Sequence, residues 1–326
     1  MISGCKELTK HVELSPKFQK STKRGYLDAI KRIEKHFPNI YIKDATAMMI
    51  DDFLNKTLCN CVTEGKLNGY STKSREHTSQ MLNKLFQYYV NKGELSSNPY
   101  KAGTITLKNN NDKKFIRPYT TEELLKLHSV RTEDGVVQSF IVGCEEGLRP
   151  SEILGCITSG FNPKMRRLQI QRAIVQNEIK EPKTDYSKRH IEISSLSVSL
   201  LSELLEQGKV LKHEYKLGSQ NSTDTFFFTN PATGDVWKNS SDYYQALKPY
   251  FKRAGVEFRG SKPARHTFVN RSVETGCDKR DVADHIGQSN AKVLVKNYLH
   301  WSSNLRGSSQ FKQQRERASL GGLIAA

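Results

Sequence analysis

Residues 261–276 read SKPARHTFVNRSVETG, a stretch with the marks of one complete helix. Ser261 is a typical N-cap, and Gly276 is typical of the residue that closes a helix. Lys262 and Arg265 are three positions apart, so they lie on one face of the first turn, where their like charges repel. A bound phosphate would turn that repulsion into attraction. Taken alone, the pair is more simply a solvated helix end.

The charge of the whole chain favours a polyanionic partner. Among its 326 residues, Lys and Arg number 51 and Asp and Glu number 34, which gives a net charge of +17. Such an imbalance opposes compaction and suits nucleic acid. The length favours two domains, and a hydrophobic content of 36% is enough for packed cores.

The cysteines and the apolar runs exclude several classes of protein. The six cysteines are scattered and lack the paired spacing of metal ligands, so we expect reduced thiols, no metal and no cofactor. No apolar run approaches the roughly 20 residues of a membrane span, and the N-terminus lacks the apolar region of a secretory signal. We therefore expect a cytoplasmic protein, associated with the nucleoid when it binds DNA.

The first third of the chain is predicted to be a small helical bundle. Apolar residues recur at steps of three and four over residues 15–37, 46–58 and 71–91, and lysine and arginine occupy the opposite faces. About 14 residues are expected to precede the first helix. Residues 105–118 break the pattern with an NNND run and several lysines, which is typical of an exposed linker.

The rest of the chain is predicted to be mainly α with a small antiparallel β-sheet, an α+β domain at residues 119–301. Thr120 and Glu123 have the spacing of a capping box, which begins the domain with a helix. Alternating apolar residues over 165–193, around a central turn, predict a short antiparallel sheet. Helices resume after it, and the run FFFTN at 226–230 is either a buried strand or an apolar anchor.

Three more motifs place reactive side chains along this domain. Arg149 stands in GLRPSEILG, at a predicted helix start where anions bind. Lys183 stands in EPKTDYSKRHIEI, just before a tight turn, and Tyr298 stands in ADHIGQSNAKVLVKNYLHW near the C-terminus. Each motif alone has a plainer explanation, since capping turns, exposed turn lysines and packed tyrosines are common.

Taken in order, these motifs resemble the tyrosine recombinase, or phage integrase, family over nearly the whole chain. The resemblance implies an Xer-like layout or a compact mobile-element integrase, with two domains that close around DNA as a clamp. Residues 1–104 then look like the helical core-binding, SAM-like domain, 105–118 like a basic linker and 119–301 like the catalytic domain. Residues 302–326 are either a disordered tail or a segment that docks on a neighbouring protomer.

The resemblance also implies a role for each motif. Tyr298 looks like the nucleophile that attacks a DNA phosphate. Arg149 and Arg265 look like the two arginines that stabilise the phosphate and the transition state. Lys183 looks like the general acid that protonates the leaving oxygen, a role that suits a side chain able to lose its proton.

Two positions depart from the pattern of the family. Lys262 stands where members have histidine, and Gln288 stands where they have histidine or tryptophan. We expect Lys262 to donate to a non-bridging phosphate oxygen and Gln288 to donate a hydrogen bond. His285 and His300 are alternative replacements for the missing histidines, and the sequence leaves that choice open.

The implied function is site-specific DNA recombination, by integration and excision or by resolution, through a 3′-phosphotyrosine intermediate and without metal or ATP. The implied partners are a double-stranded recombination site, further copies of the chain in a dimer and a synaptic tetramer, and an accessory DNA-bending or directionality protein. Two alternatives stay open. One is a catalytically weakened DNA-binding or regulatory relative, favoured by Lys262 and Gln288, and the other is strand passage by a type IB topoisomerase.

Overall fold

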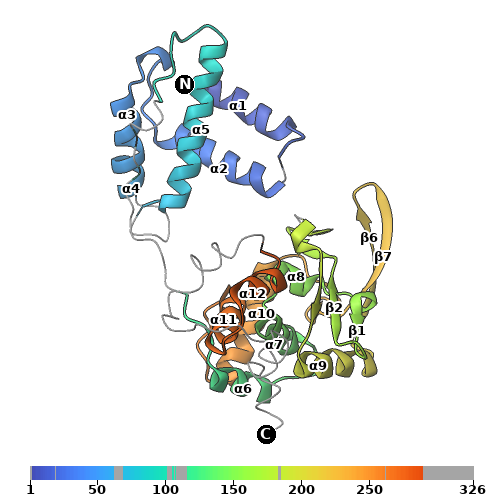
Figure 1. Ribbon diagram of the computed structural model, residues 1–326. Helices are drawn as coiled ribbons and strands as arrows, with labels where there is room; N and C mark the ends of the chain where they lie inside the picture. The colour runs from blue at the N-terminus through green and yellow to red at the C-terminus, as the bar shows by residue number, and fades with distance from the viewer. Residues whose placement is uncertain are drawn as a thin grey trace. The chain divides into compact units, whose positions relative to one another are not determined.

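The computed structural model of the chain divides into two compact units, residues 1–114 and residues 115–326 (Figure 1). The boundary falls within residues 105–118, and the expected limits of the domains and of the linker remain predictions. The structure describes residues 2–18, 20–61, 69–100, 105, 107, 116–182, 185–260 and 262–288. Its architecture is mainly helical with small antiparallel sheets, which confirms the predicted fold class.

The N-terminal unit is a helical bundle around one apolar core (Figure 1). Three long helices pack on one another: α1 (Ile2–Leu14), α2 (Lys20–His36) and α5 (Thr72–Asn91). Two shorter helices lie between the second and third of these, α3 (Ala47–Asp52) and α4 (Leu58–Asn60), joined by a π-helical turn at Phe53–Thr57. Each long helix buries one face, as its apolar spacing predicts.

The first of these helices was not expected from the sequence. The prediction of about 14 residues before the first helix is wrong, because α1 fills that stretch. Cys5, Leu8 and Val12 are all buried, at steps of three and four residues along one face. Cysteine behaves as a small hydrophobic side chain here, and burial raises the pKa of its thiol to about 12.

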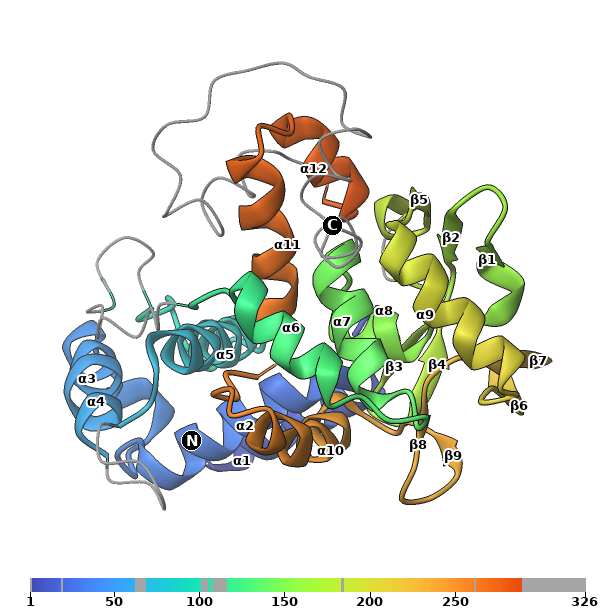
Figure 2. The ribbon, with the colours of Figure 1, turned by 90° about the horizontal axis from the view of Figure 1, so that it is seen from below.

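The C-terminal unit is built around one central helix, α7 (Val136–Glu146), all of whose residues are buried. A helix that is buried on every side is a core element. The other helices, several of which pack directly on α7, surround it in Figures 1 and 2. They are α6 (Thr121–Ser129), α8 (Pro150–Leu154), α9 (Ser195–Glu206), α10 (Ser240–Arg253), α11 (Lys262–Glu274) and α12 (Lys279–His285). The predicted capping box of Thr120 and Glu123 starts α6, which confirms it.

The predicted antiparallel sheet is present but is divided more finely than the alternation suggests. A three-stranded sheet joins β1 (Phe161–Asn162), β2 (Arg167–Ile170) and β5 (Arg189–Glu192). Between its last two strands, β3 (Ala173–Val175) and β4 (Glu178–Lys180) form a separate hairpin. That hairpin turns at Gln176 and Asn177, which both have positive φ, so the chain reverses there as well as at the predicted turn.

A second hairpin, which the sequence analysis did not predict, extends away from the rest of the C-terminal unit (Figure 1). Its strands β6 (Leu211–Leu217) and β7 (Gln220–Phe226) pair along their whole length. Arg172 braces it, since its Nε donates to Tyr215 Oη at 2.6 Å and to Asp224 Oδ2 at 2.9 Å. The run FFFTN supplies the end of β7, two buried phenylalanines and the short strand β8 (Thr229–Asn230), which pairs with β9 (Asp235–Val236).

Within the described ranges, no helix has both the length and the apolar character needed to cross a bilayer.

Gly147 closes α7 where two other helices come close. Its φ is +63°, and a Cβ built on it would lie 2.5 Å from Phe268 Cδ1 and 2.8 Å from Ile286 Cγ2. Gly147→Ala should therefore combine the cost of a left-handed alanine, about 1–2 kcal/mol, with an overpacking cost of about 1–3 kcal/mol. Gly208→Ala is the matched control, because Gly208 has φ +65° and open space around it.

Urea unfolding followed by tryptophan fluorescence measures this difference, since both tryptophans belong to residues 115–326. We expect Gly147→Ala to lose at least twice the free energy of unfolding that Gly208→Ala loses. Equal losses would show that the helices around Gly147 can separate without cost.

Candidate active site

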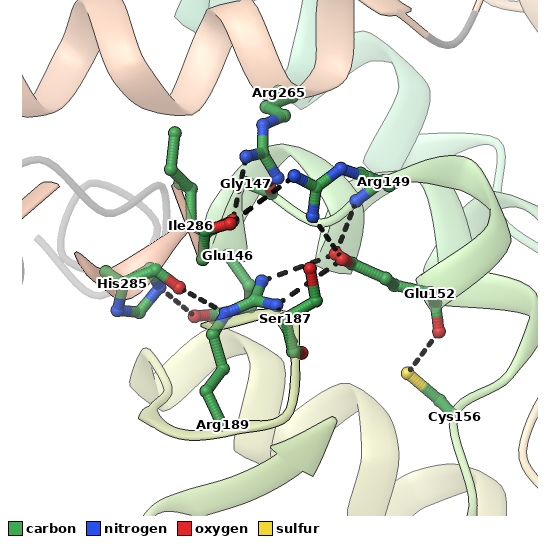
Figure 3. Close-up of polar contacts among 11 residues, drawn as sticks. Glu146, Gly147, Arg149, Glu152, Cys156, Ser187, Arg189, Arg265, His285 and Ile286 are labelled. Atoms are coloured by element: carbon green, nitrogen blue, oxygen red, sulfur yellow. Dashed lines mark hydrogen bonds and ion pairs between the residues drawn. The ribbon is translucent and has the colours of Figure 1, made fainter. Parts of the chain in front are cut away.

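Two of the predicted site residues, Arg149 and Arg265, meet at the end of α7 (Figure 3). Arg265 lies in the first turns of α11 and is 6% exposed. Its Nη1 donates to Gly147 O at 3.1 Å and its Nη2 donates to Ile286 O at 2.7 Å. The guanidinium group therefore fixes the C-terminal end of α7 against the C-terminal end of α12, satisfying carbonyls that a helix end leaves without partners.

Arg149 is the more accessible of the two arginines. It is the N-cap residue of α8, and Pro150 occupies the first position of that helix, which its fixed φ favours. Its Nη1 donates to Glu152 Oε1 at 2.6 Å, and its Nη2 donates to Gly287 O at 3.4 Å. Its side chain remains 39% exposed, so an anion in solvent can reach it.

A buried carboxylate, Glu152, holds the arginines in place. Its side chain is 3% exposed, and it accepts hydrogen bonds from the backbone N and Nη1 of Arg149 and from both Nη atoms of Arg189, at 2.6–3.4 Å. Burial alone would raise its pKa, but the charges of Arg189, Arg149 and Arg265 outweigh that effect and lower the pKa below its ordinary value. Glu152 is therefore ionised, and three guanidinium groups around one carboxylate leave an excess of positive charge.

Arg189 connects the loop before β5 to the end of α12. Its Nε donates to His285 O at 2.6 Å and its Nη1 donates to Ser187 O at 3.1 Å (Figure 3). Gly287 allows this close approach, because its φ is +65° and a Cβ there would lie 2.8 Å from Tyr186 O. The residues that follow Lys183 in sequence thus pack directly against the turn that faces Arg149.

Of the other predicted site residues, the structure describes some and leaves others outside the described ranges. Lys262 is exposed on the first turn of α11. Gln288 directly follows Gly287, whose carbonyl accepts a hydrogen bond from Arg149 Nη2, and its own N donates to Ala283 O at 2.9 Å. Residues that lie outside the described ranges are Lys183, Ser261, Tyr298, His300 and the tail 302–326.

His285 occupies a structural position within the C-terminal unit. Its ring stacks on Phe268, with a centroid distance of 4.8 Å, and its Nε2 lies 3.8 Å from Glu146 Oε2. Glu146 also accepts hydrogen bonds from the N and Oγ of Ser194, both at 3.1 Å. The imidazole therefore faces the buried end of α7, and it is the backbone carbonyl of His285 that contacts the arginine cluster.

Sequence reasoning missed Glu152 and Arg189 as members of the site. Glu152 is the third residue of α8, where an acidic side chain ordinarily caps a helix, and this local explanation conceals its second role. Arg189 begins a strand, where an exposed arginine is unremarkable. A usable signal was present in GLRPSE, because a carboxylate three residues after an arginine that binds anions can hold its guanidinium group in place.

Comparisons with known proteins show what the whole chain is similar to. No protein-family model matches the chain. The chain is 25% identical over 290 residues to a tyrosine recombinase XerC-like protein of Caldanaerobacter subterraneus subsp. tengcongensis, a match that covers 82% of this chain and 73% of the relative.

Two solved structures share the fold. The integrase of transposon Tn1549, in complex with a circular intermediate DNA, matches with a TM-score of 0.72 at 17% identity, over 92% of this chain and 96% of that one. A lambda integrase tetramer bound to a Holliday junction matches with a TM-score of 0.60 at 15% identity, over 97% of this chain and 78% of that one. At such identities the likeness shows a common fold.

Replacing the buried carboxylate tests its role as a counterion. Glu152→Gln should destabilise the C-terminal unit by about 3–5 kcal/mol at pH 7, because it leaves buried guanidinium groups without compensation. The folded-state pKa of Glu152 lies below the ordinary 4.5, so its stabilising charge is fully present above that value and is lost as the pH falls through the folded pKa. The difference between the two proteins should therefore shrink as the pH falls below 4.5.

Urea unfolding at a series of pH values from about 7 to about 2.5, which spans the range below the ordinary pKa, measures that difference. The matched control is Glu181→Gln, which removes an exposed carboxylate paired with Lys188, and it should leave the unfolding midpoint unchanged. A Glu152→Gln deficit that stays constant over the whole series would contradict the counterion role.

Proposed function

We propose that the chain is a tyrosine recombinase of the integrase family and that it recombines double-stranded DNA at a specific site. The observation that carries the proposal is the convergence of Arg149 and Arg265 around the ends of α7 and α12, with Glu152 as their buried counterion. This cluster has a net positive charge, a fixed geometry and one arginine that solvent reaches. Those are the properties that a site for a phosphodiester needs.

The chemistry of strand exchange explains why two arginines are required. In the proposed first step, Tyr298 Oη bonds to a phosphorus atom, the bond from phosphorus to the 5′-oxygen breaks, and the leaving oxygen takes a proton. Negative charge gathers on the non-bridging oxygens in the transition state, and guanidinium groups stay charged and present planar sets of donors to them. The phosphotyrosine bond conserves the energy of the broken linkage, so the reverse attack by another 5′-hydroxyl needs no ATP.

The remaining roles follow from position and from residue chemistry. Lys183 is proposed as the general acid, supported by the close packing of Tyr186 and Ser187 at the arginine cluster. Lys262 is proposed to donate to a non-bridging oxygen, supported by its exposure one helical turn before Arg265. Gln288 is proposed to donate a hydrogen bond beside Gly287. The arginines supply the charge that a metal ion would otherwise supply, and we include independence from metals in the proposal.

The N-terminal unit is proposed to bind the same duplex through phosphates. The exposed side of α2 carries Lys20, Arg24, Lys31 and Lys35, while its opposite side is buried in the core. Contacts of this kind release counterions, so affinity should fall steeply with salt. Lambda integrase has been solved as a tetramer on a Holliday junction, and we propose the same kind of assembly here, with residues 302–326 docking on a neighbouring protomer.

Formation of a covalent adduct tests the proposed reaction. The chain is incubated with nicked suicide duplexes made from the DNA that flanks its gene, and protein joined to DNA is detected on a denaturing gel. We expect an adduct that Tyr298→Phe abolishes and that Arg265→Lys reduces by about 10²-fold or more, since lysine cannot reproduce the planar set of donors.

The other outcomes identify the alternatives. Specific binding of a flanking duplex without any adduct, under every condition of pH and salt, would indicate a DNA-binding relative and would contradict the proposal. An adduct accompanied by relaxation of supercoils, without strand exchange, would indicate a topoisomerase.

The unusual residue at position 262 gives a separate test. Lys262→Ala should slow single-turnover cleavage by about 10²-fold, while the affinity for the duplex changes little, because the lost donor acts mainly on the charge of the transition state. Lys262→His should keep part of the rate. Lys252→Ala is the matched control, because it removes an exposed cation from α10, and its cleavage rate should equal that of the unaltered protein. Cleavage by Lys262→Ala at the unaltered rate would refute the assigned role.

A further inference from the structure

The residue through which the chain enters the C-terminal unit is bonded to both sides of the first turn of α11. Tyr119 Oη accepts a hydrogen bond from Arg259 N at 2.9 Å and donates one to Gly260 O at 3.3 Å, just before the helix. Tyr119 N donates to Thr267 Oγ1 at 2.8 Å, two residues after Arg265. One tyrosine therefore spans the segment that carries Lys262 and Arg265.

Arg259 reinforces this connection with a charged pair. Its Nη1 and Nη2 donate to the two carboxylate oxygens of Glu123 at 2.8 and 2.6 Å, and its Nη2 also donates to Pro118 O at 3.1 Å. The guanidinium group lies over the ring of Tyr119, 4.0 Å from its centroid. Such a paired, stacked geometry is one that lysine cannot form. We name the set Tyr119, Glu123, Arg259 and Thr267 the linker clasp.

The apolar contacts of Tyr119 do not require these polar bonds. Its ring is buried against Phe140 and Phe251, with centroid distances of 5.2 and 5.5 Å. Apolar packing of that kind holds the start of the unit in place but defines the orientation of the Tyr119 ring and backbone only loosely. The hydrogen bonds of Tyr119 fix that orientation, and each of them joins Tyr119 to α11 or to the residues just before it.

We propose that the linker clasp positions the first turn of α11, so that Lys262 and Arg265 meet the phosphate in the correct register. The inference rests on the proposed function and adds Tyr119, Glu123 and Arg259 to it as positioning residues, which do not touch the DNA phosphate themselves. Arg265 is fixed at its tip by the carbonyls of Gly147 and Ile286. The clasp fixes the backbone from which that side chain and Lys262 extend.

Single-turnover cleavage and DNA affinity, measured on the full chain, separate positioning from binding. Tyr119→Phe keeps the packed ring and removes the two bonds of the hydroxyl, and Arg259→Lys keeps the charge and removes the paired geometry. Both should slow cleavage by about 10-fold, because small displacements of catalytic groups are costly, while the Kd for the duplex stays within about twofold. Cleavage at the unaltered rate in both variants would overturn the proposal.

Tyr243→Phe is the matched control for a loss of stability alone. Tyr243 is as buried as Tyr119, and its hydroxyl accepts a hydrogen bond from Ser139 Oγ at 2.9 Å on α7, rather than bonding to α11 or to the residues just before it. Cleavage by Tyr243→Phe should proceed at the unaltered rate. If it slowed as much as cleavage by Tyr119→Phe, the clasp would be an ordinary part of the core and the proposal would be overturned.

Hydrogen exchange of the free protein tests the clasp independently of catalysis. If the unaltered chain forms no adduct, that result contradicts the proposed function alone, and the exchange rates still decide whether the clasp exists. In Tyr119→Phe, amides of residues 266–270, the first that α11 protects, should exchange at least 10-fold faster than in the unaltered protein, while those of α7 keep their rates. Unchanged exchange at residues 266–270 would overturn the clasp whatever the catalytic result.

Discussion

The site depends on one ionised carboxylate that is buried among three guanidinium groups. Bringing Arg149, Arg189 and Arg265 together without it would place like charges in a medium that screens them poorly. Glu152 removes most of that repulsion and binds two of the arginines directly. One residue thereby joins the start of α8 to the first strand residue of β5, and through Arg189 to the end of α12. Three guanidinium groups around this one carboxylate leave an excess of positive charge for an incoming phosphate.

Helix ends supply the rest of the geometry. Gly147 and Ile286 belong to the C-terminal ends of α7 and α12, where carbonyls lack partners within their own helices. Arg265 donates a hydrogen bond to each of these carbonyls, and the two bonds together fix the orientation of its guanidinium group. The close approach also requires residues without side chains at positions 147 and 287. Packing, backbone conformation and charge thus act on the same few atoms.

Local signals in the sequence were sufficient for part of this outcome. The capping box of α6 and the closure of α11 by Gly276, with its φ of +88°, were readable because each depends on residues near one another in the chain. Arg149 and Arg265 were selected as site candidates only because their motifs resemble those of a known family. The contacts of Glu152 with Arg189, and of Arg259 with Glu123, join segments far apart in sequence, and no spacing rule reveals them. The helix α1 was missed because its buried face begins with a cysteine. The β6–β7 hairpin was missed because it has no continuous apolar face.

The β6–β7 hairpin is also a place where residues can be added to the chain with little loss of stability. Leu211 and Phe226 are paired at its base, so the two ends lie together whatever happens at the tip. Arg172 braces the strands from the side through Tyr215 and Asp224, well before the turn at Gly218. Residues added at Gly218 would leave both the base and the brace in place. The tip is accordingly a suitable point for grafting a peptide label.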